Sequence, residues 1–325
     1  MKTILITGGC GFIGSHLVEL LVKKGHDVTV FDKYTFNGSL GWLENSIYKK
    51  NIKFILGDIR DYDLVFKSTK KKDCVLHLAA LIGIPYSYLS PLAYIRTNIE
   101  GTYNILEASK SNNISRIIVT STSETYGTAQ TKKINEKHRL NAQSPYAASK
   151  IAADQLSLSY YRSFNLPVNI IRPFNTFGPR QSLRAIIPTI IYQIIKKKQF
   201  LVLGNLKPTR DFTYVNDTCL AFEKLINFKK SFGEVINIGS NNNISMQELA
   251  NKIITLMNSN IKIKTSKNKI RNKKTEVNYL RCDNSYSFNK LRWKPIYNFE
   301  DSLKETIDWF IKNYKNFYGY DTFKK

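Results

Sequence analysis

The stretch Thr7-Gly8-Gly9-Cys10-Gly11-Phe12-Ile13-Gly14 decides the fold, because it lies between a predicted strand and a predicted helix. Lys2 to Thr7 is apolar and rich in β-branched residues, as a buried strand is, whereas Ser15 to Lys23 has leucines at helical spacing. A glycine-rich turn at this point lets backbone N–H groups close on a pyrophosphate at the N-terminus of the helix. The stretch therefore predicts dinucleotide binding.

A second predicted strand, Asp27 to Phe31, supports this interpretation. It ends at Asp32, at about the distance past the glycines where an acidic residue binds a ribose 2′-OH. The alternative is an incidental glycine-rich turn. The order of these features favours a cofactor site, because a strand, a helix, a second strand and an acidic residue follow one another as expected.

Strand-like runs continue along the chain with helical patterns between them, such as Ala93 to Ser109 and Pro145 to Phe164. This alternation predicts a Rossmann-type, doubly wound parallel sheet with helices on both faces. We expect an NAD-binding domain at 1–177 plus 211–240. A smaller mixed α/β domain at 178–210 plus 241–325 would then bind the substrate. The further predicted strands are Ile52 to Leu56, Cys74 to Leu78, Arg116 to Thr120, Val168 to Arg172 and Val235 to Ile238.

Composition restricts the class of protein. The chain has 325 residues, 42% of them hydrophobic, which excludes a disordered or fibrous protein. No apolar run is long enough to span a bilayer, and the apolar start leads into glycines rather than a signal-peptide cleavage site. The four cysteines are far apart and the four histidines show no metal-like spacing, so we expect no metal site. A reducing cytoplasm is the expected location.

The net charge of +24 raises the alternative of a nucleic-acid-binding protein. The lysines, however, are scattered, and the short runs at 70–72 and 196–198 are not interleaved with stacking aromatics. Solvated lysine faces that also attract anionic ligands explain the charge more simply. We therefore expect neither nucleic acid nor membrane as a partner.

Tyr146 and Lys150 form a Y-x-x-x-K pair at the start of a predicted helix, so both side chains face one way. Tyrosine ordinarily titrates near pH 10, so a catalytic tyrosine needs its pKa lowered by about three units. An ammonium group one turn away and an oxidised nicotinamide would provide that bias. The alternative is a surface tyrosine beside a solvated lysine.

These motifs together resemble the extended short-chain dehydrogenase/reductase family, whose members modify nucleotide sugars. The resemblance covers nearly the whole chain and includes Arg172-Pro173-Phe174-Asn175. It implies a tightly held NAD, with Tyr146 as base, Lys150 on the nicotinamide ribose and Thr122 on the sugar hydroxyl. The residues that it implies at the cofactor are Gly8, Gly11, Phe12, Ile13, Gly14, Asp32, Asp58, Ile59, Leu78, Ala79, Ala80, Asn98, Tyr146 and Lys150.

The reaction depends on Thr122-Ser123-Glu124, which looks like the Thr-Asp-Glu signature of sugar-nucleotide 4,6-dehydratases with serine in place of the aspartate. Once C4 of a hexose is a ketone, the C5 proton is acidic and a carboxylate can remove it. Glu124 is the candidate base. A Thr-Ser-Glu signature also resembles UDP-glucuronate decarboxylases, whereas plain 4-epimerases lack the glutamate. The simpler interpretation of Glu124 is a surface carboxylate at a strand end.

Further segments are similar to the dehydratases of the legionaminic-acid pathway, among them Phe177-Gly178-Pro179-Arg180-Gln181 and Pro208-Thr209-Arg210-Asp211. The resemblance implies a GDP- or UDP-linked N-acetylglucosamine as the substrate. Arg271-Asn272 departs from the Arg-Pro that the family often has. The resemblance implies that Ser123, Asn175, Arg180, Arg210 and Arg271 bind the substrate. The arginines suit a diphosphate because guanidinium groups bind phosphate oxygens in pairs.

The sequence thus predicts an NAD-dependent 4,6-dehydratase of a nucleotide-linked N-acetylhexosamine. The alternatives are a UDP-glucuronate decarboxylase, a nucleotide-sugar 4-epimerase and, outside enzymes, a basic NAD-sensing protein that binds nucleic acid. The family usually pairs through two helices per subunit, here Ala93 to Ser109 and Pro145 to Phe164. A homodimer is therefore expected from the resemblance alone.

Overall fold

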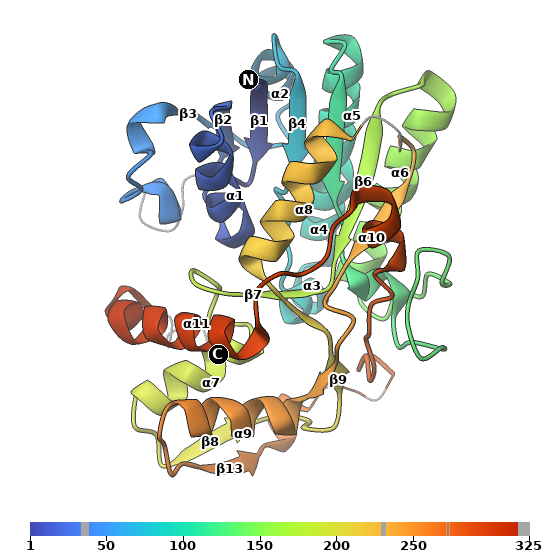
Figure 1. Ribbon diagram of the computed structural model, residues 1–325. Coiled ribbons are helices and arrows are strands. Elements are labelled where there is room, and N and C mark those ends of the chain that lie inside the picture. Colours follow the sequence, from blue (N-terminus) through green and yellow to red (C-terminus); the bar gives the residue numbers. More distant parts are fainter. Residues whose placement is uncertain (34–38, 229–231, 271, 273, 318–325) are drawn as a thin grey trace.

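The computed structural model describes residues 1–33, 39–228, 232–270, 272 and 274–317, and places a seven-stranded parallel sheet at its centre (Figure 1). The strand order is β11-β6-β5-β4-β1-β2-β3, so the direction of winding reverses between β1 and β4. Ligands bind in the crevice at such a reversal. The strands are β1 (Thr3–Thr7), β2 (Asp27–Asp32), β3 (Ile52–Leu56), β4 (Cys74–His77), β5 (Arg116–Thr120), β6 (Val168–Pro173) and β11 (Val235–Ile238).

Helices cover both faces of this sheet, which confirms the Rossmann-type fold. On one face α1 (Phe12–Lys23) packs against α8 (Val215–Asn227). On the other, α2 (Tyr62–Thr69), α5 (Gly101–Ser111) and α6 (Pro145–Phe164) pack side by side. Alternate β1 side chains serve the two faces, with Ile4 and Ile6 in one apolar cluster and Leu5 in the other.

The helix expected over Ala93 to Ser109 is present, but a π-helical turn that the sequence did not indicate widens its middle. The chain forms α3 (Ile84–Leu89), α4 (Pro91–Tyr94), a π-helical turn (Ile95–Glu100) and then α5. The π turn contains Asn98, whose side chain bonds to the backbone of the segment after β4. Such wide turns recur at functional sites, because they redirect one side chain without ending the helix.

Most of the remaining segments form the lower part of the molecule in Figure 1, whereas residues 285–291 lie higher, beside β11 and α8. Their helices are α7 (Ile186–Ile195), α9 (Met246–Leu256), α10 (Ser285–Leu291) and α11 (Phe299–Asn313). Their short strands are β7 (Asn175–Phe177), β8 (Phe200–Leu203), β9 (Thr209–Arg210), β10 (Phe212–Tyr214), β12 (Ile244–Ser245) and β13 (Lys262–Thr265). Ser245 caps α9 in a capping box with Glu248, which fixes the start of that helix.

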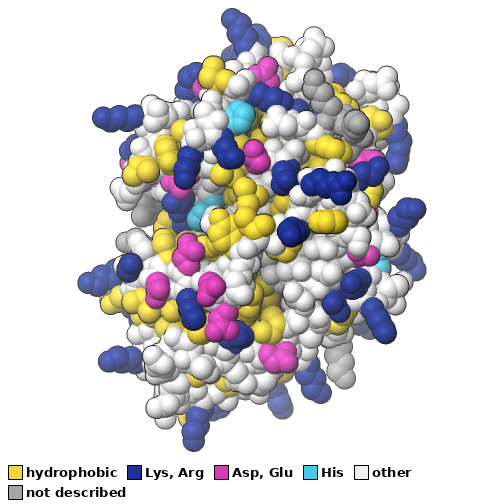
Figure 2. Space-filling view, viewed as in Figure 1, with side chains coloured by type: hydrophobic (Ala, Val, Ile, Leu, Met, Phe, Trp, Pro, Cys, Tyr) yellow, Lys and Arg dark blue, Asp and Glu magenta, His cyan; other side chains and the backbone are white. Residues whose placement is uncertain are grey.

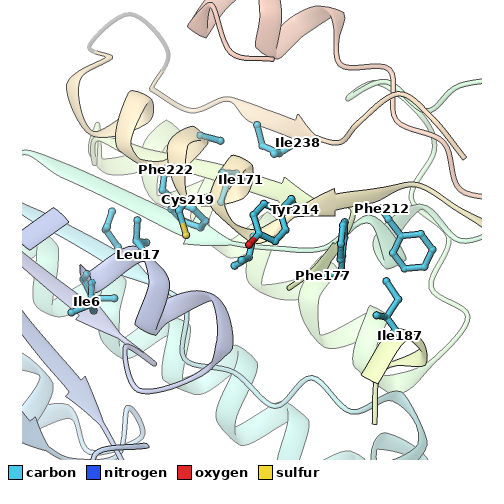
Figure 3. Close-up of a cluster of buried hydrophobic side chains, with 14 of the residues drawn as sticks. Ile6, Leu17, Ile171, Phe177, Ile187, Phe212, Tyr214, Cys219, Phe222 and Ile238 are labelled. Carbon is cyan, nitrogen blue, oxygen red and sulfur yellow. The ribbon is translucent and has the colours of Figure 1, made fainter. Parts of the chain in front are cut away.

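One hydrophobic cluster joins the lower segments to the sheet. It includes Ile6, Leu17, Phe177, Phe212 and Leu249. Figure 3 shows the part of it from Ile6 and Leu17 to Phe177 and Phe212. α10 also packs against β11 and α8 rather than against α9. The division into 1–177 plus 211–240 and 178–210 plus 241–325 stays a prediction.

Lys and Arg side chains are spread over the whole face shown in Figure 2 and do not form a single stripe. In the described ranges no helix has the length and apolarity to cross a membrane. Cys10, Cys74, Cys219 and Cys282 are buried free thiols. Over the same ranges no three His, Cys, Asp or Glu residues are grouped as a metal ion needs.

Candidate active site

The glycine turn between β1 and α1 has a geometry that only glycine allows. Gly8 has φ of +73°, and a Cβ there would lie 2.7 Å from the amide nitrogen of Ala79. A Cβ on Gly14 would lie 2.2 Å from the Gly8 carbonyl oxygen. Gly11 is the N-cap and has no side chain to cap α1, so the first-turn N–H groups stay available for an anion. The turn fits a dinucleotide pyrophosphate.

Asp32 lies at the end of β2 beside this turn. Its carboxylate accepts hydrogen bonds from the backbone N–H groups of Cys10 and Lys33, both at 2.8 Å. Burial raises the pKa of Asp32, and these two donors oppose the increase. A carboxylate held here can accept the hydroxyl protons of a ribose.

A pocket of about 570 Å³ opens beyond Asp32, lined by Asp58, Arg60, Asp61, Arg96 and Glu100. Asp58 pairs with Lys33 at 2.6 Å and with Arg60 at 2.5 Å. Burial opposes ionisation of Asp58, but the Arg60 and Lys33 donors outweigh it and hold its pKa well below the usual value. The neighbouring Ile59 is buried against Gly101. The cofactor contacts expected of Asp58 and Ile59 stay a prediction.

Leu78, Ala79 and Ala80 follow β4 across the reversal point from the glycine turn. The Leu78 N–H donates to the Thr7 carbonyl at 3.1 Å, and the Ala79 N–H donates to the Thr7 hydroxyl at 3.2 Å. Asn98 anchors the continuation of this segment, with its Oδ1 2.8 Å from the Leu81 nitrogen and its Nδ2 2.9 Å from the Ser149 hydroxyl. Asn98 therefore ties the cofactor edge to helix α6.

Helix α6 carries the Tyr146–Lys150 pair in its first two turns. Ser144 caps the helix by accepting the Ala147 N–H at 3.1 Å, and Pro145 occupies the first turn. Both Tyr146 and Lys150 are buried, at 7% and 5% exposure. The Lys150 ammonium donates to the Thr120 carbonyl at 2.5 Å. Burial lowers the pKa of Lys150 to about 8, although Asp154 opposes the decrease.

Burial raises the pKa of Tyr146 well above its usual value, contrary to what a base requires. A hydrogen bond from Thr122 favours the phenolate, whereas the charge of Glu124 disfavours it. Additional positive charge is needed before Tyr146 can act as a base near neutral pH. Lys150 and a bound oxidised nicotinamide are the available sources.

Thr122 and Glu124 reach this place from a short 3₁₀ turn, η4 (Ser123–Tyr126), after β5. The Thr122 hydroxyl accepts the Glu124 N–H at 3.2 Å, which fixes the start of the turn. Glu124 is half-buried and Ser123 is almost fully buried. Thr122 and Glu124 thus act on Tyr146, and Lys150 follows Tyr146 by about one turn of α6. The catalytic roles of these four residues stay a prediction.

Tyr94 belongs to the site and was missed by sequence analysis. Its ring lies edge-on to Tyr146, with centroids 6.2 Å apart, and its hydroxyl donates to the Gly83 carbonyl at 2.5 Å. Arg184 acts electrostatically on Tyr94 and lies within reach of Gly83. No local motif marks Tyr94, because its position depends on how α4 packs against α6.

The residues expected to bind the substrate have different surroundings in the structure. Asn175, in β7, has a buried Oδ1 without a hydrogen-bond partner in the described part of the chain, as a residue awaiting a ligand would have. Arg210 is 3.9 Å from Glu276. Arg180 pairs with Glu19 of α1 at 2.9 Å. Arg271 lies outside the described residues. Substrate binding by this set, and by Ser123, stays a prediction.

Comparisons with known proteins agree with this geometry. The family model described as GDP-mannose 4,6 dehydratase matches residues 5–306. The chain is 32% identical to the dTDP-D-glucose 4,6-dehydratase of Homo sapiens, covering 97% of this chain and 91% of that protein. It is 36% identical to the UDP-N-acetyl-alpha-D-glucosaminuronate decarboxylase of Bacillus cytotoxicus, covering 95% and 98%.

A solved structure shows the same fold with its cofactor. It is a dTDP-glucose 4,6-dehydratase from Streptomyces venezuelae that contains NAD, with a TM-score of 0.87, 27% identity and coverage of 96% of this chain and 98% of that chain. Fold, site and relatives agree. The chain belongs to the extended short-chain dehydrogenase/reductase family of NAD-dependent sugar-nucleotide dehydratases, epimerases and decarboxylases.

Proposed function

We propose that the protein catalyses the NAD-dependent 4,6-dehydration of a GDP- or UDP-linked N-acetylglucosamine to the 4-keto-6-deoxy sugar. The observation that carries this proposal is the position of Glu124, whose carboxylate acts on Tyr146 from the turn that also holds Thr122. A 4-epimerase needs only the oxidation of C4, whereas elimination needs a second base. The N-acetylglucosamine itself is supported by the resemblance to the legionaminic-acid-pathway dehydratases.

In this proposal Tyr146 removes the C4 hydroxyl proton, with Thr122 relaying it. Lys150 binds the nicotinamide ribose and favours the phenolate. A bound NAD would supply the hydride chemistry, by taking the hydride from C4 and giving it back at C6. Glu124 removes the C5 proton and passes it to the departing C6 hydroxyl, since Ser123 cannot act as a carboxylic acid. As the hydride adds to C6, C5 takes up one proton, which balances the proton that Tyr146 took from the C4 hydroxyl. The sugar loses one water and no NAD is consumed.

Screening nucleotide sugars tests the proposal. We expect UDP- or GDP-N-acetylglucosamine to lose 18 mass units and to give a 4-keto product detectable by mass spectrometry. UDP, GDP, CDP and dTDP sugars should be compared at equal concentration. An unchanged mass with altered stereochemistry would instead identify a 4-epimerase.

Decarboxylation of a nucleotide-linked uronic acid is the second candidate. The 36% identity to the Bacillus cytotoxicus decarboxylase favours it, as does the Thr-Ser-Glu sequence. In this reaction oxidation at C4 is followed by loss of carbon dioxide from C5, so no C5 proton need be removed. Loss of 44 mass units from a uronate substrate, with no dehydration of N-acetylglucosamine, would establish it.

The proposal extends to the segments that bind the substrate and to the cellular location of the enzyme. Segments 178–210 plus 241–325 would bind the nucleotide sugar, with Asn175, Arg180, Arg210 and Arg271 on its diphosphate. Four buried free thiols suit a reducing cytoplasm, which cell fractionation would check. Binding of duplex or single-stranded nucleic acid at physiological salt would support the non-enzyme alternative.

A second copy of the chain is the proposed partner, through an apolar surface on α3, α4, the π turn and α5. Its exposed side chains are Tyr86, Tyr88, Leu89, Leu92, Ile95 and Tyr103. Contiguous exposed apolar side chains of this kind mark association sites. α6 contacts α3, α4 and α5, so the two helices that the resemblance implies lie together.

Replacing Leu92 by Glu should shift the protein from dimer to monomer in sedimentation experiments, because a charge would be buried in the interface. The matched control is Ile296→Glu, which changes a similarly exposed aliphatic side chain that is not part of the apolar surface. A monomeric unmodified protein, or a dimer insensitive to Leu92→Glu, would contradict the proposed surface.

A further inference from the structure

A fully buried ion pair lies beneath the active site and has no part in the proposed chemistry. Arg172, at the end of β6, is 2% exposed, and Asp154, on α6, is not exposed at all. The Nε and Nη2 atoms of Arg172 donate to Asp154 Oδ2 at 3.0 and 2.8 Å. Buried charges are costly to desolvate, so a retained pair needs an explanation beyond stability.

One end of this pair supports the Tyr146–Lys150 helix. Asp154 is one helical turn after Lys150, and its Oδ2 also accepts the Ser121 hydroxyl at 2.7 Å. Ser121 directly precedes Thr122 in the chain. The carboxylate thus ties the middle of α6 to the end of β5.

The other end supports the turn that carries Glu124. The third nitrogen of Arg172, Nη1, donates to the Tyr126 hydroxyl at 2.9 Å, and its guanidinium carbon lies 4.9 Å from the ring centroid. Tyr126 is the last residue of η4 and is fully buried. Its hydroxyl in turn donates to Asn237 Oδ1 at 2.8 Å, in β11.

We propose that Arg172 is a positioning residue that sets the Glu124 turn relative to the Tyr146–Lys150 helix, by holding Tyr126 with one nitrogen and Asp154 with the other two. It is too deeply buried to touch the substrate. The inference rests on the proposed function, since it assigns the two halves of the site to two successive steps: C4 oxidation for the helix, and C5 proton removal for the turn.

The charges around Lys150 agree with this arrangement. Asp154 lies on the same helix, Tyr146 precedes it by one turn, and His77 approaches from β4. Asp154 favours the Lys150 ammonium but disfavours the Tyr146 phenolate. Arg172 pairs with the Asp154 carboxylate at hydrogen-bond distance. This pairing weakens the effect of Asp154 on the Tyr146 phenolate, while the carboxylate still holds α6 in place.

Tyr126→Phe tests the turn. It removes one hydroxyl and keeps the ring, so folding should survive. We expect the rate of C5 deuterium exchange from solvent to fall by about 10- to 100-fold, since small displacements of a base have effects of this size. Single-turnover NAD reduction, which reports C4 oxidation, should stay within about threefold. The matched control is Tyr160→Phe, which removes the hydroxyl that Glu107 accepts at 2.8 Å, further along α6.

Asp154→Asn tests the helix. Removal of the carboxylate should lower the pKa of Lys150, because Asp154 favours the ammonium form. The pH at which C4 oxidation is lost on the alkaline side should therefore fall by about one pH unit. At pH 6.5, where Lys150 stays protonated, the oxidation rate should approach that of the unmodified enzyme. If Asp154→Asn does not fold, Ser121→Ala should show a smaller decrease in the same direction.

The Tyr126→Phe and Asp154→Asn experiments can each contradict the inference through a different result. Equal slowing of both steps by Tyr126→Phe, or a changed melting temperature with no change in either step, would show a purely structural role. An unshifted pH profile in Asp154→Asn would do the same for the helix. If the unmodified enzyme oxidises C4 without any C5 exchange, the proposed dehydration is refuted. The pH profile of Asp154→Asn would then be the only remaining test of the inference.

Discussion

Replacing Tyr146 by Phe should lower turnover by about 10²- to 10⁴-fold, the range over which a general base contributes. In the proposed mechanism the phenol removes the C4 hydroxyl proton, and Thr122 lies close enough to favour the phenolate. The ring should stay packed against Tyr94, so the substrate KM and melting temperature should change little. Steady-state formation of the 4-keto product measures the effect.

Tyr160→Phe is again a suitable control, because Tyr160 is another buried, hydrogen-bonded tyrosine of α6. It should retain turnover within a few fold. Activity of Tyr146→Phe within about tenfold of the unmodified enzyme would mean that another group takes the proton, and the assigned mechanism would have to be abandoned.

The second large effect is expected for Glu124→Gln, which should stop the reaction after C4 oxidation. The amide keeps the size of the side chain but cannot accept the C5 proton. We expect turnover to fall by about 10²- to 10⁴-fold while a stoichiometric burst of NAD reduction persists. Stopped-flow absorbance at 340 nm and loss of C5 deuterium exchange measure the two steps.

Glu124→Gln should also move the pH profile of the burst. The Glu124 carboxylate raises the pKa of Tyr146, so its removal should shift the acidic limb of the profile, where the rate rises as Tyr146 ionises, toward lower pH. Glu223→Gln, on the distant helix α8, supplies a carboxylate-to-amide control with no expected change. Full turnover by Glu124→Gln would favour a 4-epimerase or a decarboxylase over the dehydratase.

The cofactor edge could be predicted from sequence because its determinants are local. Gly8, Gly14 and Asp32 act through backbone geometry and strand ends, which short motifs encode. Tyr146 and Lys150 are likewise four residues apart on one helix. The resemblance added Thr122 and Glu124, and the structure brings all four together.

Residues whose role depends on packing could not be predicted in this way. Asp154 reads as an ordinary helical aspartate, and Arg172 as a polar end of a strand. Only the packing of α6 on β6 joins them. The π turn was missed for a similar reason, because the interactions of Asn98 lie seventeen and fifty-one residues away in the chain. For Arg180 the sequence resemblance suggested a substrate contact, but it did not indicate the ion pair that Arg180 forms with Glu19.

The apolar interior shared by Ile6, Phe177 and Leu249 limits how such an enzyme can acquire new substrates. Close-packed interiors transmit a change in one side chain to its neighbours. A mutation of a buried side chain in segments 178–210 plus 241–325 is therefore expected to disturb the parallel sheet as well. Divergence of specificity is confined to the rim, where residues such as Arg184 can vary without loosening the common interior.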